Sequence, residues 1–204
     1  MDRRSSLSTG LEWAVAQQRR ERADAARNRR AILDATRALL AEGGAEAVTM
    51  DRVAAAAGVG KGTVFHRFGS RAGLLHAMVA EPAETLRAAI TDGPPPLGPG
   101  APAGERLLAF FDAMATMVAD NVELMVAAYR SVPPHPRTSE FHATWAEHIT
   151  KLLTEARPDL DAEGVGHLLF GMLGSDYALS AVREGQSERL RESVRQVVLA
   201  VVSP

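Results

Sequence analysis

The sequence predicts an all-α protein of about nine helices. Alanine, leucine, arginine and glutamate are abundant, whereas aromatic residues make up only 5 % of the chain. No sustained alternation of polar and apolar residues is present, and no Asn-Gly or Asp-Gly pair joins two β-branched runs. With 46 % apolar residues, 204 residues are enough to form a packed core in one or two domains.

The N-terminal third predicts a three-helix helix-turn-helix domain over residues 23–70. Gly43-Gly44 ends a long amphipathic helix, Thr49 can cap the next helix, and Gly58 supplies the turn before the third. The expected elements in order are a basic arm over 1–22, helices over 24–42, 50–57 and 60–67, and a connecting helix over 71–91. Pro82 is expected to kink or split the connecting helix, because proline lacks the N–H of the helical ladder.

The remainder, residues 92–204, predicts a helical dimerisation and ligand-binding domain. It opens with a proline- and glycine-rich loop over 92–104, which cannot be helical. Four helices are then expected, over residues 105–131, 138–156, 161–184 and 187–202.

Composition excludes several classes of protein. There is no cysteine, which removes disulfides, thiolate metal sites and cysteine nucleophiles. No apolar run reaches the roughly 20 residues of a membrane span, and the N-terminus lacks a signal-peptide core. No phosphate-binding loop, dinucleotide fingerprint, nucleophile elbow or His-Glu-x-x-His helix is present. We therefore expect a cytoplasmic protein that is not an enzyme and has no cofactor, no metal and no membrane partner.

The two halves differ in charge. Residues 1–87 carry 14 Arg or Lys against 10 Asp or Glu, whereas residues 88–204 carry 9 against 15. Either the first half meets a polyanion, or two solvated surfaces differ by chance. The arginines of the arm have the same two interpretations, namely phosphate or minor-groove contacts, or a solvated extension.

The stretch from Thr49 to Arg71 has the pattern of a helix-turn-helix. Small and apolar residues can face the supporting helix, and the second short helix can then present its other side to a major groove. Backbone N–H groups at the N-termini of the two short helices are suited to bind DNA phosphates, and short side chains can contact the edges of the bases. The predicted DNA-contacting set is Thr49, Arg52, Gly60, Lys61, Gly62, Thr63, Phe65, His66, Arg67 and Arg71. Similar helix pairs also occur in bundles that never touch DNA.

Residues 24–87 resemble the TetR family of transcriptional regulators. Residues 60–75 read GKGTVFHRFGSRAGLL, where the family typically shows SKGTLYxHFxSKExLL. The resemblance implies phosphate contacts from Thr49 and Arg71, with Lys61, Thr63 and His66 in or beside the groove. Phe65 departs from a common tyrosine and lacks its hydroxyl.

The resemblance also implies a homodimer that reads a palindromic operator. The last two predicted helices supply the expected interface, either through small residues and one apolar stripe or, alternatively, as an ordinary intramolecular core. The predicted interface residues are Leu168, Gly171, Ser175, Ala178, Val194 and Val198.

Methionines and aromatic residues of the C-terminal half predict an adaptable apolar pocket, although the same residues could simply fill a core. The predicted pocket residues are Phe110, Met114, Met117, Met125, Tyr129, Trp145, Phe170 and Tyr177. The resulting expectation is a bacterial repressor that binds double-stranded operator DNA and is released by a small apolar or aromatic effector. A non-DNA-binding helical bundle and an enzyme on a helical scaffold are the alternatives.

Overall fold

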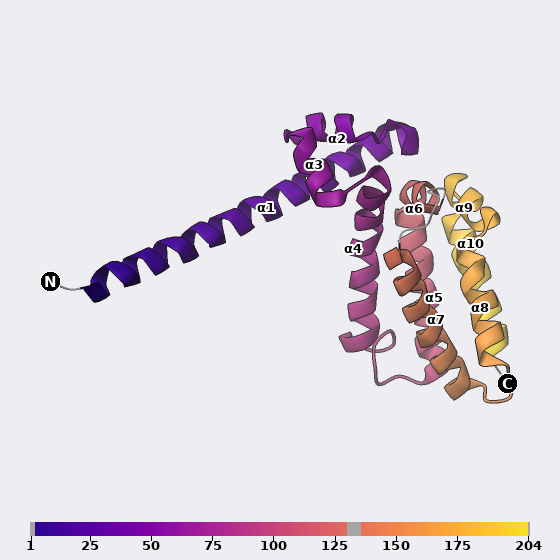
Figure 1. Ribbon diagram of the computed structural model, residues 1–204. Coiled ribbons are helices and arrows are strands. Elements are labelled where there is room, and N and C mark those ends of the chain that lie inside the picture. Colours follow the sequence, from indigo (N-terminus) through magenta and orange to yellow (C-terminus); the bar gives the residue numbers. More distant parts are fainter. Residues whose placement is uncertain (1–2, 130–135, 204) are drawn as a thin grey trace. The chain divides into compact units, whose positions relative to one another are not determined.

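The computed structural model describes residues 3–129 and 136–203, with side chains over residues 17–127 and 141–203. Every regular element in these ranges is a helix (Figure 1), which confirms the all-α prediction. The helices are α1 (Arg3–Ala47), α2 (Met50–Ala57), α3 (Lys61–Phe68), α4 (Arg71–Asp92), α5 (Ala103–Asp120), α6 (Val122–Tyr129), α7 (Pro136–Ala156), α8 (Ala162–Leu173), α9 (Asp176–Arg183) and α10 (Ser187–Val202).

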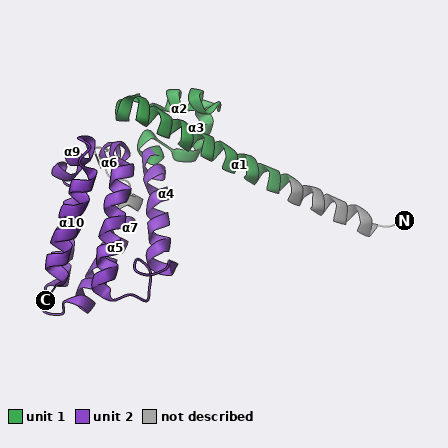
Figure 2. Cartoon of the chain, turned by 180° about the vertical axis from the view of Figure 1, so that it is seen from behind, with its two compact units in different colours: residues 1–74 green, residues 75–204 purple. Residues whose placement is uncertain are grey.

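The chain forms two compact units, residues 1–74 and residues 75–204 (Figure 2). In the first unit α2 packs on both α1 and α3. Helix α1 begins at Arg3, so the expected arm has no helix boundary near residue 22 and its backbone continues directly into the long helix. Gly43 and Gly44 leave helical geometry, and this kink ends the long straight part of α1 where the two glycines predicted it.

In the second unit α5 packs against α7 and α10, and α7 packs against α8. The largest fully buried side chains there come mainly from α5 and α7, among them Phe110, Phe111, Ile149 and Leu152. These residues belong to one apolar cluster that also takes in α10, so the middle of the bundle is a continuous core.

Three predicted helices have different bounds in the structure. Helix α4 runs through Pro82 without a break. The helix expected over 105–131 is divided at Asn121, and the one expected over 161–184 is divided at Gly174-Ser175. The hydroxyl of Ser175 accepts a hydrogen bond from the Ala178 N–H at 3.2 Å, so a new helix cap forms where the periodicity alone indicated continuity.

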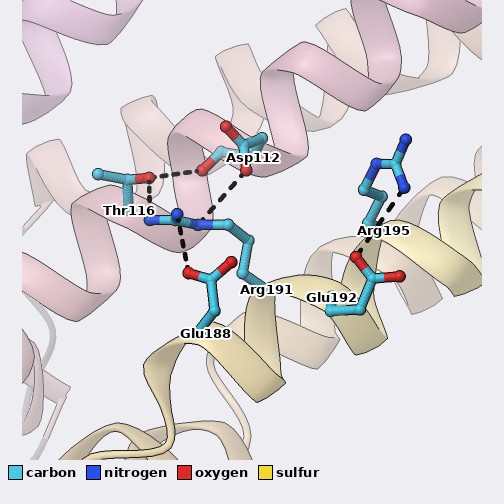
Figure 3. A network of polar contacts seen from close by, with 6 residues as sticks. All are labelled: Asp112, Thr116, Glu188, Arg191, Glu192 and Arg195. Atoms are coloured by element: carbon cyan, nitrogen blue, oxygen red, sulfur yellow. Dashed lines mark hydrogen bonds and ion pairs between the residues drawn. The ribbon is translucent and has the colours of Figure 1, made fainter.

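A polar network fixes α10 on α5 (Figure 3). Arg191 of α10 forms ion pairs with Asp112 at 3.4 Å and with Glu188 at 3.1 Å, and it donates to the Thr116 hydroxyl at 3.1 Å. The guanidinium therefore has two carboxylate partners and one hydroxyl partner. On the same helix Leu190, Val194 and Val198 are buried, so the apolar stripe of α10 faces the interior.

Candidate DNA-binding site

The turn between α2 and α3 forms because of two local features. The Thr49 hydroxyl accepts from the Arg52 N–H at 3.2 Å and caps α2. At the C-terminal end of α2, Gly58 has φ of 65°. The Gly58 N–H donates to the Ala55 carbonyl, and the Val59 N–H donates to the Ala54 carbonyl. Because this left-handed conformation is costly for residues with a Cβ, glycine fits the turn that aims α3 away from α2.

One side of each short helix anchors it to α1. Val53 and Val64 are fully buried, and Phe68 is 8 % exposed. The Arg29 guanidinium of α1 lies over the Phe68 ring, 5.5 Å from its centroid. Helix α3 is therefore held along its back, and the side chains on its opposite face are left to solvent.

That opposite face brings together most of the predicted contact residues of α3. Lys61, Phe65, His66 and Arg67 are exposed, and Thr63 is half-buried. The Lys61 ammonium forms an ion pair with Asp51 of α2 at 2.7 Å and lies 5.9 Å from the Phe65 ring centroid. Both partners of this pair are well exposed, so the pair contributes little to stability and leaves Lys61 available to a phosphate.

The two glycines at the start of α3 leave its backbone open. Gly60 occupies the N-cap position without a side-chain cap. An added Cβ on Gly62 would meet nothing within 4 Å. Glycine in a helix is unfavourable by about 1 kcal/mol relative to alanine, and nothing inside the chain requires it at this position. The missing side chain leaves the backbone at Gly62 open to close approach from outside.

Arg52 and Thr49 lie at the exposed N-terminal edge of α2, where Arg52 is 3.4 Å from Glu42. Arg71 also has a structural role. Its guanidinium donates to the carbonyls of Val48 at 2.8 Å and Ala45 at 2.6 Å, and the side chain is partly buried. These bonds join the start of α4 to the turn before α2, and the phosphate contact that the resemblance implies for Arg71 stays a prediction.

Half of the predicted interface residues lie inside the subunit. Val194 and Val198 face the core with α5, and Ala178 is fully buried. For these three the intramolecular alternative is correct, since the stripe of α10 is used within the chain. Ser175 caps α9. Leu168 is 76 % exposed, and the space beside Gly171 is open.

The predicted pocket residues also divide into two groups. Most of them are buried in the core of the second unit, namely Phe110, Met114, Met117, Met125 and Trp145. Phe170 is half-buried and contacts the Trp145 ring at 6.0 Å. Tyr177 is 61 % exposed and does not belong to this interior. The Tyr129 side chain lies outside the described residues.

Sequence reasoning missed some polar residues of the site. Asp51 stands opposite Lys61 although the two lie on different helices, and Arg29 reaches Phe68 from α1. No spacing rule within a single helix links such pairs. Over the side chains that the structure describes, no three histidines or carboxylates gather as a metal site. Within the same ranges no helix has the length and apolarity of a membrane span.

Comparison with known proteins supports this geometry. Residues 32–78 match the family of bacterial regulatory proteins described as the tetR family. The fold is similar to that of the regulator FadR from Bacillus subtilis in complex with stearoyl-CoA, with a TM-score of 0.64 and 20 % identity over 85 % of this chain and 97 % of that one.

Two further solved structures are similar. A regulator of the TetR/AcrR family from Thermobifida fusca has a TM-score of 0.63 and 22 % identity over 84 % of this chain and 96 % of that one. PfmR from Thermus thermophilus has a TM-score of 0.61 and 20 % identity over 84 % of this chain and 96 % of that one. No curated protein matches the sequence. Residues 32–78 thus match the helix-turn-helix unit of the tetR family of bacterial regulatory proteins, and the chain as a whole has the fold of TetR-family transcriptional regulators.

Proposed function

We propose that the protein is a ligand-responsive transcriptional repressor that binds a palindromic operator as a dimer. The observation that carries the proposal is the outward face of α3, where Lys61, His66 and Arg67 are exposed together while Val64 and Phe68 hold the helix from behind. A helix held in this way enters a major groove with cations for phosphates and short side chains for base edges.

Gly62 supports the same proposal independently. Its backbone is open, and the glycine is unfavourable for α3 itself. An operator phosphate or base edge that approaches the backbone closely gives this residue a use. In this proposal the contact set is the predicted one, in which Arg71 also positions the start of α4.

The test is binding to the intergenic DNA beside the protein's own gene, measured by fluorescence anisotropy at two salt concentrations. We expect tight, competitor-resistant binding that weakens steeply with salt, because phosphate contacts release counterions. Lys61→Ala combined with Arg67→Ala should abolish specific binding. Arg195→Ala, which also removes an exposed arginine but lies on α10, serves as the control and should bind normally.

Binding equal to that on random DNA, or a double variant as active as the wild type, would contradict the DNA-binding role.

Dimerisation follows from the need to read two half-sites about 34–36 Å apart. We infer that the interface uses the exposed part of the predicted set, Leu168 and the open side of Gly171 on α8, together with Val197 on α10, which is 42 % exposed. Leu168→Glu should shift the protein from dimer to monomer in analytical ultracentrifugation. Thr154→Glu, at an exposed position of α7, is the matched control. A monomeric wild type, or a dimeric Leu168→Glu, would contradict this interface.

The effector is proposed to be a small molecule with an apolar or aromatic body. The support is the aromatic and methionine-rich interior of the second unit, in which Phe110, Met114 and Trp145 are all buried. Binding of stearoyl-CoA by the Bacillus subtilis neighbour agrees with an apolar ligand. Release of operator DNA requires only that the effector bind one of two states more tightly than the other.

A further inference from the structure

Unsatisfied polar atoms gather where α5 packs against α7. Among the described side chains, the Nε atom of Arg106, the indole nitrogen of Trp145 and the Nε2 atom of His148 are inaccessible to solvent and have no hydrogen-bond partner. Two other buried atoms share this property, His76 Nε2 and Arg191 Nε. Buried polar atoms in proteins are normally paired, so each exception needs an explanation. Three of the five lie on two contacting helices, where one polar group from outside the chain could serve them.

The charge around these atoms is positive. Burial, together with the nearby cations Arg106 and Lys151, lowers the pKa of His148 to about 4. Within the described residues no carboxylate lies within ion-pair distance of either cation, and the acids next in sequence, Glu105 and Glu147, are exposed. The imidazole is therefore neutral near pH 7, and the two cations that act on it, Arg106 and the exposed Lys151, form no ion pair with a described carboxylate.

Another arginine of the same unit has carboxylates beside it. Arg191 forms ion pairs with Asp112 and Glu188 and contacts the Thr116 hydroxyl (Figure 3), although its Nε atom is also buried without a hydrogen bond. Arg106 makes one side-chain hydrogen bond to a described residue, a long one of 3.4 Å to the Ile90 carbonyl. The difference between the two arginines is that Arg106 has no carboxylate partner among the described residues.

Aromatic rings surround the same place. The His148 ring lies 5.2 Å from Phe110, and Trp145 contacts Phe141 at 5.9 Å and Phe170 at 6.0 Å. An inorganic anion has no apolar part that could pack against these rings. A molecule with an acidic head and an apolar body would use both the cations and the rings.

We propose that the second unit binds a small organic anion, with its acidic group at Arg106, His148 and Lys151 and its apolar body against Phe110 and Trp145. This inference rests on the proposed effector function and narrows it, because the ligand must carry a carboxylate or phosphate. Bidentate binding of such a group by Arg106 satisfies Nε.

The site also reaches α4. Arg106 donates to the carbonyl of Ile90 in the last turn of that helix. An anion that takes over the guanidinium competes with this carbonyl, so binding changes the contact between α5 and the end of α4. In this proposal the ligand regulates the protein because its acidic group and the Ile90 carbonyl compete for the Arg106 guanidinium.

The experiment uses the full chain carrying Trp13→Phe, which leaves Trp145 as the only tryptophan. Two acids and their alcohols, octanoate with 1-octanol and 4-phenylbutyrate with 4-phenylbutanol, are titrated against Trp145 fluorescence. We expect at least one acid to bind ten-fold more tightly than its alcohol. Lys151→Gln and Arg106→Gln should each remove most of that preference, whereas Arg195→Gln, an exposed cation on α10, should leave it unchanged.

A second readout is the NMR titration of His148, whose pKa should rise when the acid is bound because a negative charge has joined the two cations. Equal affinity for acids and alcohols, no binding of either acid, or an unchanged preference in Lys151→Gln would overturn the proposal. Operator binding by the same protein is measured separately. If the protein does not bind the operator but still prefers the acids to the alcohols, only the repressor function is rejected. If it binds the operator but shows no preference for the acids, only the anion site is rejected.

Discussion

The outward face of α3 and the interior between α5 and α7 place the same kinds of residue in opposite environments. On α3, Phe65 and the cations near it are exposed and are held from behind by a small core. Between α5 and α7, Phe110 is fully buried and Arg106 has a nitrogen that no solvent reaches. The first surface is shaped by the local backbone, whereas the second depends on helices distant in sequence.

This difference explains why the two regions are not equally predictable. A groove-binding helix needs a cap, a glycine turn and anchors at fixed spacing, all within about 25 residues of sequence. A ligand-binding interior needs side chains from several helices, and apolar residues there are equally suitable for packing. Substitutions at Phe68, Gly62, His148 and Asp51 test whether the two regions differ in this way.

The largest effect is expected at Phe68. This ring is 8 % exposed and contacts Arg29, so Phe68→Ala should lower the free energy of unfolding by about 3–5 kcal/mol. Phe65→Ala, three residues earlier and 42 % exposed, should change stability by less than about 0.5 kcal/mol but weaken operator binding. Urea unfolding and fluorescence anisotropy separate the two. Equal loss of stability in both variants would show that α3 does not have distinct inner and outer faces.

Two glycines provide the next contrast. Gly58 has φ of 65° and Gly62 lies in open helical backbone. Gly58→Ala should destabilise by about 1–2 kcal/mol, whereas Gly62→Ala should stabilise by up to about 1 kcal/mol. Despite its greater stability, Gly62→Ala should bind the operator less tightly, because the methyl group blocks close approach. Unimpaired binding by Gly62→Ala would remove the argument from its open backbone.

His148 tests the buried region through pH. Its pKa in the folded protein is about 4, below the ordinary value of 6.5, mainly because burial disfavours the charged ring. As pH falls from 6.5 the unfolded chain takes up the proton first, so stability decreases down to about pH 4 and then levels off.

Because the ring is partly solvent-accessible, we expect a loss of about 1 kcal/mol from this group. Urea unfolding at pH 7 and at pH 4.5 measures it. His148→Gln should reduce the difference between the two pH values, and His167→Gln, on an exposed part of α8, should not. The same pH dependence in both variants would mean that His148 is not the responsible group.

The smallest effect is expected at Asp51. Its ion pair with Lys61 is exposed, so Asp51→Asn should leave the free energy of unfolding within about 0.5 kcal/mol. Removal of the negative charge beside Lys61 should nevertheless raise DNA affinity roughly two- to five-fold at low salt. Asp34→Asn, which breaks a comparable pair with Arg37 on α1, is the control. An affinity gain shared by the control would indicate a general charge effect.

Several elements of the fold could be predicted because their signals are local. Gly43-Gly44, Thr49 and Gly58 each act where the sequence indicated, as a helix end, a cap and a turn. The breaks at Asn121 and Ser175 were missed, because apolar periodicity continues across both. Pro82 was expected to kink or split its helix, and the split is wrong, since α4 continues through it.

The candidate sites show the same limit. The exposed residues of α3 could be predicted from the sequence because they all lie on one helix. Val194 and Val198 were expected at a dimer interface, but a one-sided stripe does not tell which neighbour it faces, and here the neighbour is α5. The sequence analysis did not select Arg106 as a site residue. Only the fold shows that this arginine has no ion-pair partner among the described residues.

Helix α4 is held near both of its ends. Arg71 fastens its first residue to the turn before α2, and Arg106 donates to the carbonyl of Ile90 near its other end. Pro82 lies between these contacts and lacks the N–H that would complete the ladder. From Pro82 to Ile90 the helix extends about 12 Å, so a sideways step of about 1 Å at Ile90 corresponds to a change of roughly 5° in the direction of this half of the helix.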